Sequence, residues 1–220
     1  MKGAIFDLDG TLLDSMGLWA TASSSFLRSL GIEPEADVDA QVDALCLEDT
    51  AKYLIAHYPI VHSVAEVMAL INLHIEQQYF DTLPAKTGVR EFLERLKSCG
   101  IAMCVATATD YYQVEAALKR LGLLEYFSGI FTCTQVGSGK QSPAVYEAAR
   151  KHLTFLPEEI AVFEDALYAA KTAKAAGYFV VGVADDYNVQ NRIALHTLCD
   201  LFIDNWRDPK LRAVMEQCRI

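Results

Sequence analysis

Runs of apolar residues alternate with helical segments along most of the chain, and this alternation predicts an α/β fold. The apolar runs are short and nearly continuous, as in strands that are buried on both faces of a sheet. Between them, apolar residues recur at helical spacing. The predicted fold is therefore a doubly wound (Rossmann-like) parallel sheet with helices on both faces. We expect strands at 3–6, 101–106, 130–133, 160–163, 179–183 and 201–203, and helices near 88–99, 110–121, 142–153, 165–176 and 208–218.

Residues typical of helix ends support these boundaries. Gly100, Gly122 and Gly177 follow three of the expected helices, where glycine readily adopts the left-handed conformation that ends a helix. Asp110 stands before another expected helix, where its carboxylate could cap the first turn.

The segment between the first two strands has a different pattern, without strand-like runs. Two stripes of residues at helical spacing predict helices there, and the first ends at Gly31. The first stripe contains Met16, Trp19, Ala20, Ser23, Leu27 and Leu30, and the second contains Val64, Val67, Met68, Ile71, Ile75 and Tyr79. We therefore expect an α/β core formed by residues 1–14 and 82–220, with an inserted helical cap formed by residues 15–81.

Acidic residues are concentrated in this insert. The 220 residues have a net charge of −10, and residues 33–81 contain ten acids against one lysine, Lys52. An acidic protein repels nucleic-acid phosphates and anionic membrane surfaces, so neither is an expected partner. The acidic run over 33–49 is interpreted as a solvated face.

Hydropathy and cysteine usage favour a cytoplasmic protein. No uncharged apolar stretch approaches the roughly 20 residues that span a bilayer. The cysteines form no CxxC pair and have no histidine at metal-finger spacing, so we interpret them as reduced thiols that act as small buried hydrophobic residues. They are Cys46, Cys99, Cys104, Cys133, Cys199 and Cys218.

Polar residues stand just beyond several of the expected strands. Because the carboxyl ends of parallel strands meet at one edge of a sheet, these residues are expected to form a ligand site there. They are Asp7 and Asp9 after the first strand, Thr107 after the second, Glu164 and Asp165 after the fourth, and Lys140 in the loop beyond the third.

The chemistry of these side chains predicts a phosphoryl site that contains Mg²⁺. Several carboxylates in one place repel each other and resist ionisation unless a cation lies among them. Oxygen ligands without histidine or cysteine suit Mg²⁺, whose coordination is commonly completed by a substrate phosphate. Lys140, the hydroxyl of Thr107 and backbone amides near Asp110 would add donors for phosphate oxygens.

Four motifs follow one another along the expected core. They are DLDGT at 7–11, VATAT at 105–109, KQSPAVY at 140–146 and FEDALYAAKTAKAAG at 163–177. In this order they resemble the haloacid dehalogenase superfamily of phosphotransferases, and the resemblance covers the whole α/β core. The helical insert directly after the first motif resembles the small cap of the β-phosphoglucomutase-like phosphatases. The chain departs from the usual pattern at Gln141, Ala166 and Ala169, where the family commonly has Pro, Ser and Gly.

The resemblance implies a role for each acidic residue. Asp7 would be the nucleophile that attacks phosphorus and carries an aspartyl-phosphate intermediate. Asp9 would protonate the leaving alkoxide and then accept a proton from the hydrolytic water. Mg²⁺ would be bound by Asp7, by the backbone carbonyl of Asp9 and by Asp165, with Glu164 as a direct or water-mediated ligand.

The resemblance also implies contacts with the substrate. Thr107, the N–H of Ala108 and Lys140 would hold the transferring oxygens as charge builds on them. Leu8, within the first motif, is a further candidate phosphate-binding position. Trp19 is a candidate substrate contact in the cap, although packing within the insert is the favoured interpretation for it.

The expected function is Mg²⁺-dependent hydrolysis of a small phosphorylated metabolite, a sugar- or nucleotide-type monophosphate, by a monomer or weak dimer whose cap opens and closes. The alternatives are a sugar phosphomutase and a catalytically silent binding module on the same fold. A dehalogenase is disfavoured because a halide leaves without protonation and would not need Asp9.

The mutase alternative requires groups on the cap that hold a second phosphate. The resembling mutases use a histidine and an arginine, and the aligned positions here are Trp19 and Leu47. The acidic insert would also repel a second phosphate. We therefore expect monophosphates whose other end is neutral, apolar or cationic to be preferred over bisphosphates.

Overall fold

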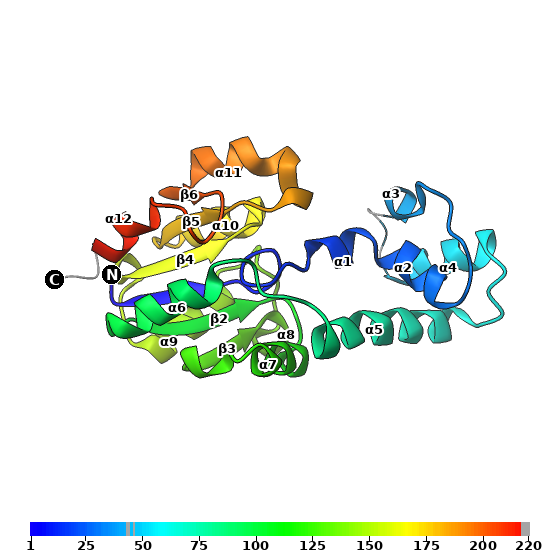
Figure 1. Cartoon of the computed structure of the whole chain (residues 1–220), viewed down its shortest axis with the longest axis horizontal. Helices are drawn as coiled ribbons and strands as arrows, with labels where there is room; N and C mark the ends of the chain where they lie inside the picture. Colours follow the sequence, from blue (N-terminus) through cyan, green and yellow to red (C-terminus); the bar gives the residue numbers. More distant parts are fainter. Residues whose placement is uncertain (43–44, 46, 217–220) are drawn as a thin grey trace. The chain divides into compact units, whose positions relative to one another are not determined.

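Two structural units make up the chain (Figure 1). The computed structural model describes residues 1–42, 45 and 47–216. A core unit comprises Met1–Ser15 and Leu83–Ile220, and an inserted unit comprises Met16–Thr82. Asp43 of the acidic run, Cys46 and Cys218 lie outside the described residues. The roles of the two units as catalytic core and cap stay predictions.

A parallel sheet forms the centre of the core unit. Its strand order is β3-β2-β1-β4-β5-β6, and every neighbouring pair is parallel. The chain thus builds outward from β1 to β3 and then returns to β4, which confirms the predicted doubly wound fold. Each strand lies within one residue of its expected position. The strands are β1 (Gly3–Phe6), β2 (Ala102–Thr107), β3 (Gly129–Thr132), β4 (Ile160–Glu164), β5 (Phe179–Val183) and β6 (Leu201–Ile203).

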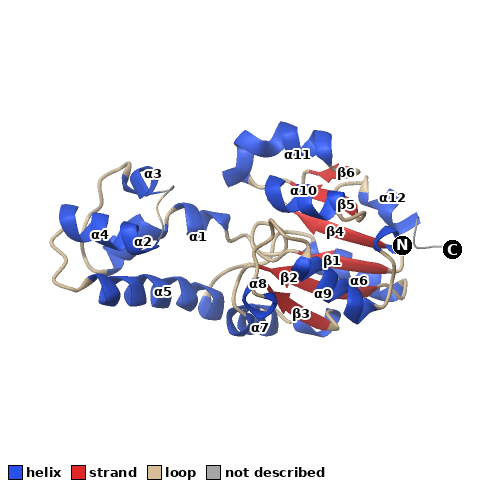
Figure 2. Cartoon of the chain, turned by 180° about the vertical axis from the view of Figure 1, so that it is seen from behind, coloured by secondary structure: helices blue, strands red, loops and turns tan. Residues whose placement is uncertain are grey.

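Helices cover both faces of this sheet (Figures 1 and 2). On one face, α9 (Ala144–Leu153), α10 (Leu167–Ala175) and α11 (Arg192–Leu198) enclose a largely aliphatic core that includes alternate strand residues. On the other face the core is aromatic. Phe6 and Phe163 stack with ring centroids 4.6 Å apart, and the ring of Trp206 lies 5.4 Å from that of Phe163. This burial holds the strand ends, and the residues that follow them, in fixed positions.

Most α-helices in the described part of the core unit lie within the expected ranges, and several shorter helical segments were not predicted. The helices α6 (Val89–Ser98), α7 (Tyr111–Arg120), α9 and α10 fall inside expected ranges, as does α12 (Leu211–Glu216) in the described part of 208–218. The sequence pattern does not predict α11. It also does not predict α8 (Cys133–Val136) or the 3-10 segments η1 (Leu124–Tyr126), η2 (Pro157–Glu159) and η3 (Asp186–Asn191).

Three of the predicted helix ends are confirmed and one predicted cap is wrong. Gly100, Gly122 and Gly177 adopt φ values of 74°, 60° and 89° after α6, α7 and α10. Asp110 does stand at the N-cap of α7, but its side chain makes no capping hydrogen bond. Its carboxylate instead accepts a hydrogen bond from the hydroxyl of Thr134 at 2.8 Å. A competing tertiary donor therefore displaces the local cap.

The described residues of the inserted unit form five helices joined by loops. The second predicted stripe is confirmed, because Val67, Ile71, Ile75 and Tyr79 are buried on α5. This helix begins with a capping box between Ser63 and Glu66. The helices are α1 (Met16–Ala20), α2 (Ala22–Ser29), α3 (Val38–Val42), α4 (Leu47–His57) and α5 (Val64–Asp81).

The first predicted stripe is wrong in part, because the helix is interrupted. Thr21 adopts a non-helical φ of −126°, which separates α1 from α2, so the residues before and after it no longer share one helix face. As a result Trp19, Ala20 and Leu30 are exposed. The buried residues of α2 are Ser23, Ser24, Phe26 and Leu27.

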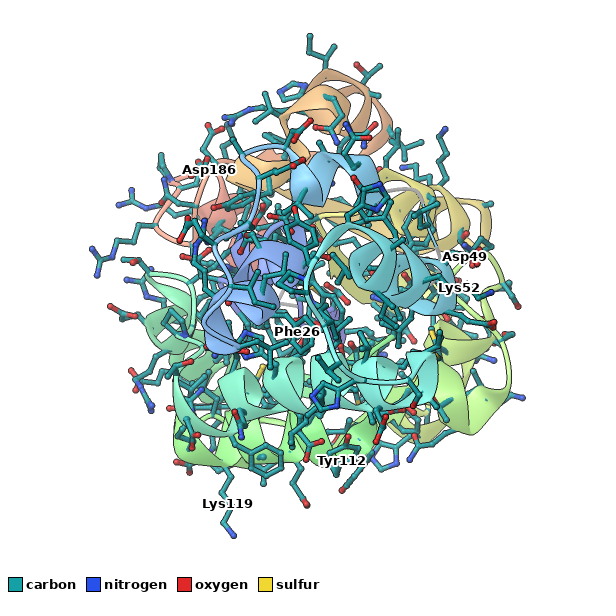
Figure 3. All side chains as sticks on the ribbon, turned by 90° about the vertical axis from the view of Figure 1, so that its right-hand side faces the viewer. Phe26, Asp49, Lys52, Tyr112, Lys119 and Asp186 are labelled. Atoms are coloured by element: carbon teal, nitrogen blue, oxygen red, sulfur yellow. The ribbon has the colours of Figure 1, made fainter. Side chains whose placement is uncertain are left out.

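Most of the acidic run is solvated, as expected, and the insert's lysine is neutralised. Glu33, Glu35 and Asp37 are exposed. Figure 3 shows Asp49 beside Lys52 on α4, and the Lys52 ammonium lies 3.3 Å from the Asp49 carboxylate and 2.8 Å from that of Glu48. The positive charge of Lys52 is therefore already compensated within its own helix.

The described residues contain no helix that is both long and apolar enough to cross a membrane. Cys99, Cys104, Cys133 and Cys199 are free thiols. Cys104 is buried, as expected, whereas Cys99 is exposed, so the interpretation as a small buried hydrophobic residue is wrong for Cys99.

Candidate active site

The register of the central strands determines where the predicted site residues lie. Phe6 of β1 pairs with Val105 of β2 on one side and with Phe163 of β4 on the other. The N–H of Asp7 donates to the carbonyl of Phe163 at 3.0 Å, so Asp7 continues alongside Glu164. The first and fourth predicted motifs therefore meet at one edge of the sheet.

A tight turn after β1 carries the second acid of the first motif. Gly10 adopts a φ of 79°, which a residue with a side chain rarely does. The carbonyl of Leu8 accepts hydrogen bonds from the N–H groups of Leu12 and Leu13 at 2.9 and 2.8 Å, and this closes the turn. The Leu8 side chain is fully buried, so any contact of Leu8 with a phosphate would use its backbone N–H.

Three buried carboxylates and one buried ammonium form the centre of the site. Carboxylate oxygens of Asp7, Glu164 and Asp165 lie within 4.8 Å of one another. The Lys140 ammonium donates to Asp7 Oδ1 and, at 2.6 Å, to Glu164 Oε1. With all four groups ionised, this cluster would carry two uncompensated negative charges.

Because burial makes this excess of negative charge unfavourable, the pKa values of Asp7 and Asp165 are raised. Burial, together with Glu164, Asp165 and Asp9, raises the pKa of Asp7 well above its usual range, although Lys140 opposes the rise. Burial and then Glu164 raise the pKa of Asp165 to about 7. Burial alone would lower the pKa of Lys140, but the Asp7 and Glu164 carboxylates raise it by more. The net pKa is raised, and the ammonium stays charged. Such shifts are typical of functional sites.

Only one of the two carboxylate oxygens of Glu164 has a hydrogen-bond partner among the described residues. Its Oε1 accepts hydrogen bonds from the Lys140 ammonium and, at 2.6 Å, from the Tyr146 hydroxyl. Its Oε2 is buried and has no hydrogen-bond partner within the described residues. Burial and the Glu164 carboxylate raise the pKa of Tyr146, so its phenol remains a donor.

Asp165 is fixed by Thr11, the last residue of the first motif, and by Asn188, which lies outside all four motifs. Its carboxylate lies 3.5 Å from the hydroxyl of Thr11, and its backbone carbonyl accepts a hydrogen bond from the Asn188 side chain at 2.8 Å. The ion pair between half-buried Lys86 and buried Asp185, 2.7 Å apart, also acts on the charge of Asp165. These contacts hold the fourth motif against the loop after β5.

The Asp9 carboxylate is oriented by two hydroxyl groups and does not join the carboxylate cluster. Ser15 donates to Asp9 Oδ1 at 2.6 Å, and Thr109 donates to Asp9 Oδ2 at 2.5 Å. The predicted metal contact of Asp9 concerns its backbone carbonyl and stays a prediction. Sequence reasoning missed both hydroxyl residues, since neither stands at a spacing that signals a partner for Asp9.

The predicted phosphate-binding residues at the end of β2 occupy the same edge. Thr107 is buried, and its Oγ1 accepts a hydrogen bond from the N–H of Thr109 at 3.1 Å. Ala108 is exposed in the turn that leads to α7. Both positions are compatible with donation to a phosphate oxygen, and their roles stay predictions.

Trp19 belongs to the inserted unit. Its indole N–H donates to the hydroxyl of Tyr79 at 3.2 Å, and 44% of its surface is exposed. The favoured expectation of a packed residue is therefore wrong for this side chain, because the break at Thr21 leaves it outside the buried face. Its role as a substrate contact stays a prediction.

The residues of the carboxylate cluster fit Mg²⁺. They offer oxygen ligands alone, which is the donor set that Mg²⁺ prefers. A divalent cation would also balance the two excess charges and give the unpartnered Glu164 Oε2 an electrostatic partner. Asp7, Asp165 and Glu164 are therefore the side chains that would hold the metal.

Comparison with known proteins decides the family. The family model described as haloacid dehalogenase-like hydrolase matches residues 4–183, which is most of the chain. The chain belongs to the haloacid dehalogenase-like hydrolases. The match includes all four motifs, so the predicted family is confirmed.

Relatives within the haloacid dehalogenase-like hydrolases include phosphatases. The phosphorylated carbohydrates phosphatase of Thermotoga maritima is 29% identical, over 80% of this chain and 82% of its own. Hexitol phosphatase A of Escherichia coli is 31% identical, over 83% of this chain and 82% of its own. A solved structure from Thermotoga maritima, provisionally named a beta-phosphoglucomutase, is 26% identical with a TM-score of 0.84 and covers 98% of this chain and 99% of its own.

These likenesses agree with the expected class of enzyme. The predicted phosphoric monoester hydrolase is confirmed at the level of a haloacid dehalogenase-like hydrolase whose relatives are phosphatases. The substrate, the metal and the covalent intermediate are finer questions.

Proposed function

We propose that this protein is a Mg²⁺-dependent phosphatase that hydrolyses a small phosphorylated metabolite through an aspartyl-phosphate on Asp7. The observation that carries the proposal is the buried cluster of Asp7, Glu164 and Asp165 around the Lys140 ammonium. Such a cluster has an excess of negative charge that a divalent cation would compensate. A cation and a lysine together favour a phosphate ligand.

The first half of the proposed reaction transfers the phosphoryl group to the protein. An oxygen of the Asp7 carboxylate forms a bond to phosphorus while the bond between phosphorus and the leaving oxygen breaks. Asp9 transfers its proton to that leaving oxygen, which departs as an alcohol. The hydroxyl groups of Ser15 and Thr109 keep the Asp9 side chain oriented.

The second half releases inorganic phosphate. Asp9, now a carboxylate, accepts a proton from a water molecule whose oxygen attacks phosphorus, and the bond between phosphorus and Asp7 breaks. Lys140, the Thr107 hydroxyl and the Ala108 N–H hold the phosphoryl oxygens in both halves. Mg²⁺, when bound, compensates the charge of the Asp7 carboxylate and of the phosphate.

The charge of the inserted unit supports a proposal on the substrate class. Lys52, the only lysine or arginine between residues 33 and 81, is already paired with Glu48 and Asp49. If the inserted unit acts as the proposed cap, a second phosphate on the substrate would meet acidic residues without a free lysine or arginine among residues 33–81. We propose a sugar- or nucleotide-type monophosphate whose other end is neutral, apolar or cationic. The phosphorylated carbohydrates and hexitols named for two relatives agree with the sugar type.

The names of some similar proteins favour the sugar phosphomutase alternative, among them the provisional name of the Thermotoga maritima structure. A mutase must hold the second phosphate of a bisphosphate intermediate. Trp19 and Leu47 occupy the positions where the resembling mutases have a histidine and an arginine, and neither side chain carries a charge. Hydrolysis is therefore the better-supported reaction.

A panel of phosphorylated metabolites tests the proposal. The purified protein is assayed for phosphate release with Mg²⁺ and with EDTA, and Asp7→Asn is the matched control for contaminating phosphatases. We expect Mg²⁺-dependent release that Asp7→Asn abolishes, with lower kcat/KM for bisphosphates than for matched monophosphates. Release that survives EDTA or Asp7→Asn would refute the mechanism, and failure on every compound would favour a silent binding module.

Conversion of one hexose phosphate into another, stimulated by a catalytic amount of bisphosphate, would instead support the mutase.

We further propose that the protein acts in the cytoplasm, which fits its free thiols, and that it is a monomer or weak dimer. Sedimentation at several concentrations would test the oligomeric state.

A further inference from the structure

Tyr146 is a large buried residue that contacts the carboxylate cluster and that the proposed mechanism does not use. It lies in the first turns of α9, and its side chain is fully buried. Its ring is 5.9 Å from the Lys140 ammonium and 6.2 Å from the ring of Tyr178. A phenol buried so deeply needs a hydrogen-bond partner. That partner is Glu164 Oε1, at 2.6 Å.

The two oxygens of Glu164 therefore have opposite environments. Oε1 accepts from both Tyr146 and Lys140, while Oε2 is buried without a partner in the described part of the chain. An unpartnered buried carboxylate oxygen is unfavourable, and rotation of the carboxylate would relieve it. Two donors on Oε1 oppose that rotation.

We propose that Tyr146 is a positioning residue that keeps Glu164 Oε1 occupied and thereby leaves Oε2 available to Mg²⁺ or to one of its water molecules. This inference rests on the Mg²⁺ site of the proposed function and adds a residue to its support. Without the phenol, Lys140 alone would hold Glu164, and that ammonium is shared with Asp7. The carboxylate could then turn Oε2 toward Lys140, and the metal would lose a partner.

Tyr146→Phe removes the hydroxyl and keeps the ring, and Tyr178→Phe is the matched control. Tyr178 is also buried and belongs to the same core cluster, but its hydroxyl donates to Glu147 Oε1 at 2.9 Å, outside the carboxylate cluster.

The measurement is Mn²⁺ binding in the absence of substrate, followed by calorimetry. We expect Tyr146→Phe to weaken Mn²⁺ binding by about tenfold, as for other outer-shell partners of metal ligands. Tyr178→Phe should change it by less than about twofold, and thermal unfolding in EDTA would confirm that both variants are folded.

A double-mutant cycle separates positioning from general loosening of the core. In a Glu164→Ala background, Tyr146→Phe should cause no further loss of Mn²⁺ affinity, because the residue it positions is gone. Equal Mn²⁺ affinity in the wild type and Tyr146→Phe would overturn the inference, as would an undiminished effect of Tyr146→Phe in Glu164→Ala. If the wild type itself binds no Mn²⁺, the metal site of the proposed function is refuted and this inference falls with it. The outcomes thus distinguish the two failures.

Discussion

At the scale of single residues, Asp9 differs from the other acids of the site. Asp7, Glu164 and Asp165 compete for one buried lysine, whereas Asp9 is held by the neutral hydroxyl groups of Ser15 and Thr109. Asp9 thus stands apart from the ion pairs of Lys140 with Asp7 and Glu164, although its charge still acts on the pKa of Asp7. This separation suits the general acid and base of the proposed reaction.

The same separation predicts how Asp9→Asn behaves. Loss of the proton donor matters most when the leaving oxygen is basic, and little when that oxygen is already a stable anion. We expect a large drop in the rate of phosphoenzyme formation with alkyl and sugar phosphates and a smaller drop with an activated aryl phosphate. Rapid-quench measurement of that step with both substrate types is the check. Equal losses would indicate that Asp9 only positions other groups.

The sequence predicted residues of this site when their chemistry and their place after a strand coincided. Asp7, Glu164 and Asp165 meet because parallel strands end at the same edge, and that rule can be applied to a sequence. Ser15, Thr109 and Tyr146 could not be found in this way. Their contribution depends on which hydroxyl group reaches which oxygen, and that depends on the path of turns and on side-chain rotamers.

At the scale of secondary-structure elements, the start of α10 is left without a side-chain cap. Ala166 occupies the N-cap position with φ of −88° and ψ of 120°, the extended conformation that capping residues adopt. The family commonly has serine there. Ala166→Ser would supply a hydroxyl for a free N–H of the first turn.

We expect Ala166→Ser to raise the free energy of unfolding by about 1 kcal/mol, the usual difference between serine and alanine at an N-cap. Urea unfolding in the presence of EDTA measures this without a contribution from bound metal. Ala175→Ser, at an exposed position near the end of the same helix, is the control for an added hydroxyl. An unchanged or lowered stability for Ala166→Ser would mean that the hydroxyl cannot reach the first-turn amides in this loop.

Strands and helices could be predicted where burial leaves a regular pattern of apolar residues in the sequence, and less well where it does not. Apart from β3, the strands are buried almost throughout, so their apolar runs mark them within one residue. By contrast, α3 lies in the acidic run, where few apolar residues reveal a face, and α4 begins at its end. The break at Thr21 also left no signal, because threonine is tolerated within helices.

At the scale of the whole molecule, the buried acids couple folding to pH and to metal. In the metal-free protein, the pKa of Asp165 is raised from 3.8 to about 7, and that of Asp7 is raised as well. The folded state therefore retains protons that the unfolded state has released. The contribution of these two carboxyl groups to stability is therefore lost as pH rises from about 4 through about 7.

Mg²⁺ binding requires the ionised carboxylates, so it should reverse this loss. We expect the increase in Tm caused by Mg²⁺ to be small near pH 5 and to grow up to about pH 8. Thermal unfolding with Mg²⁺ and with EDTA across this range tests the expectation. Asp165→Asn should flatten the pH dependence in EDTA, and a Tm increase that shrinks with rising pH would contradict it.

The central place of β1 has a consequence for how the chain folds during synthesis. β1 pairs with β2 and β4, so Gly3 must meet Ala102 and Ile160, which are made much later. The inserted unit is complete by Thr82, well before either partner strand exists. Contacts of such long sequence separation form slowly, because the intervening chain must first be ordered. We expect the first strand, with Asp7 and Asp9 behind it, to stay unpaired on the ribosome until β4 has emerged, so that the site and the centre of the sheet form in one late step.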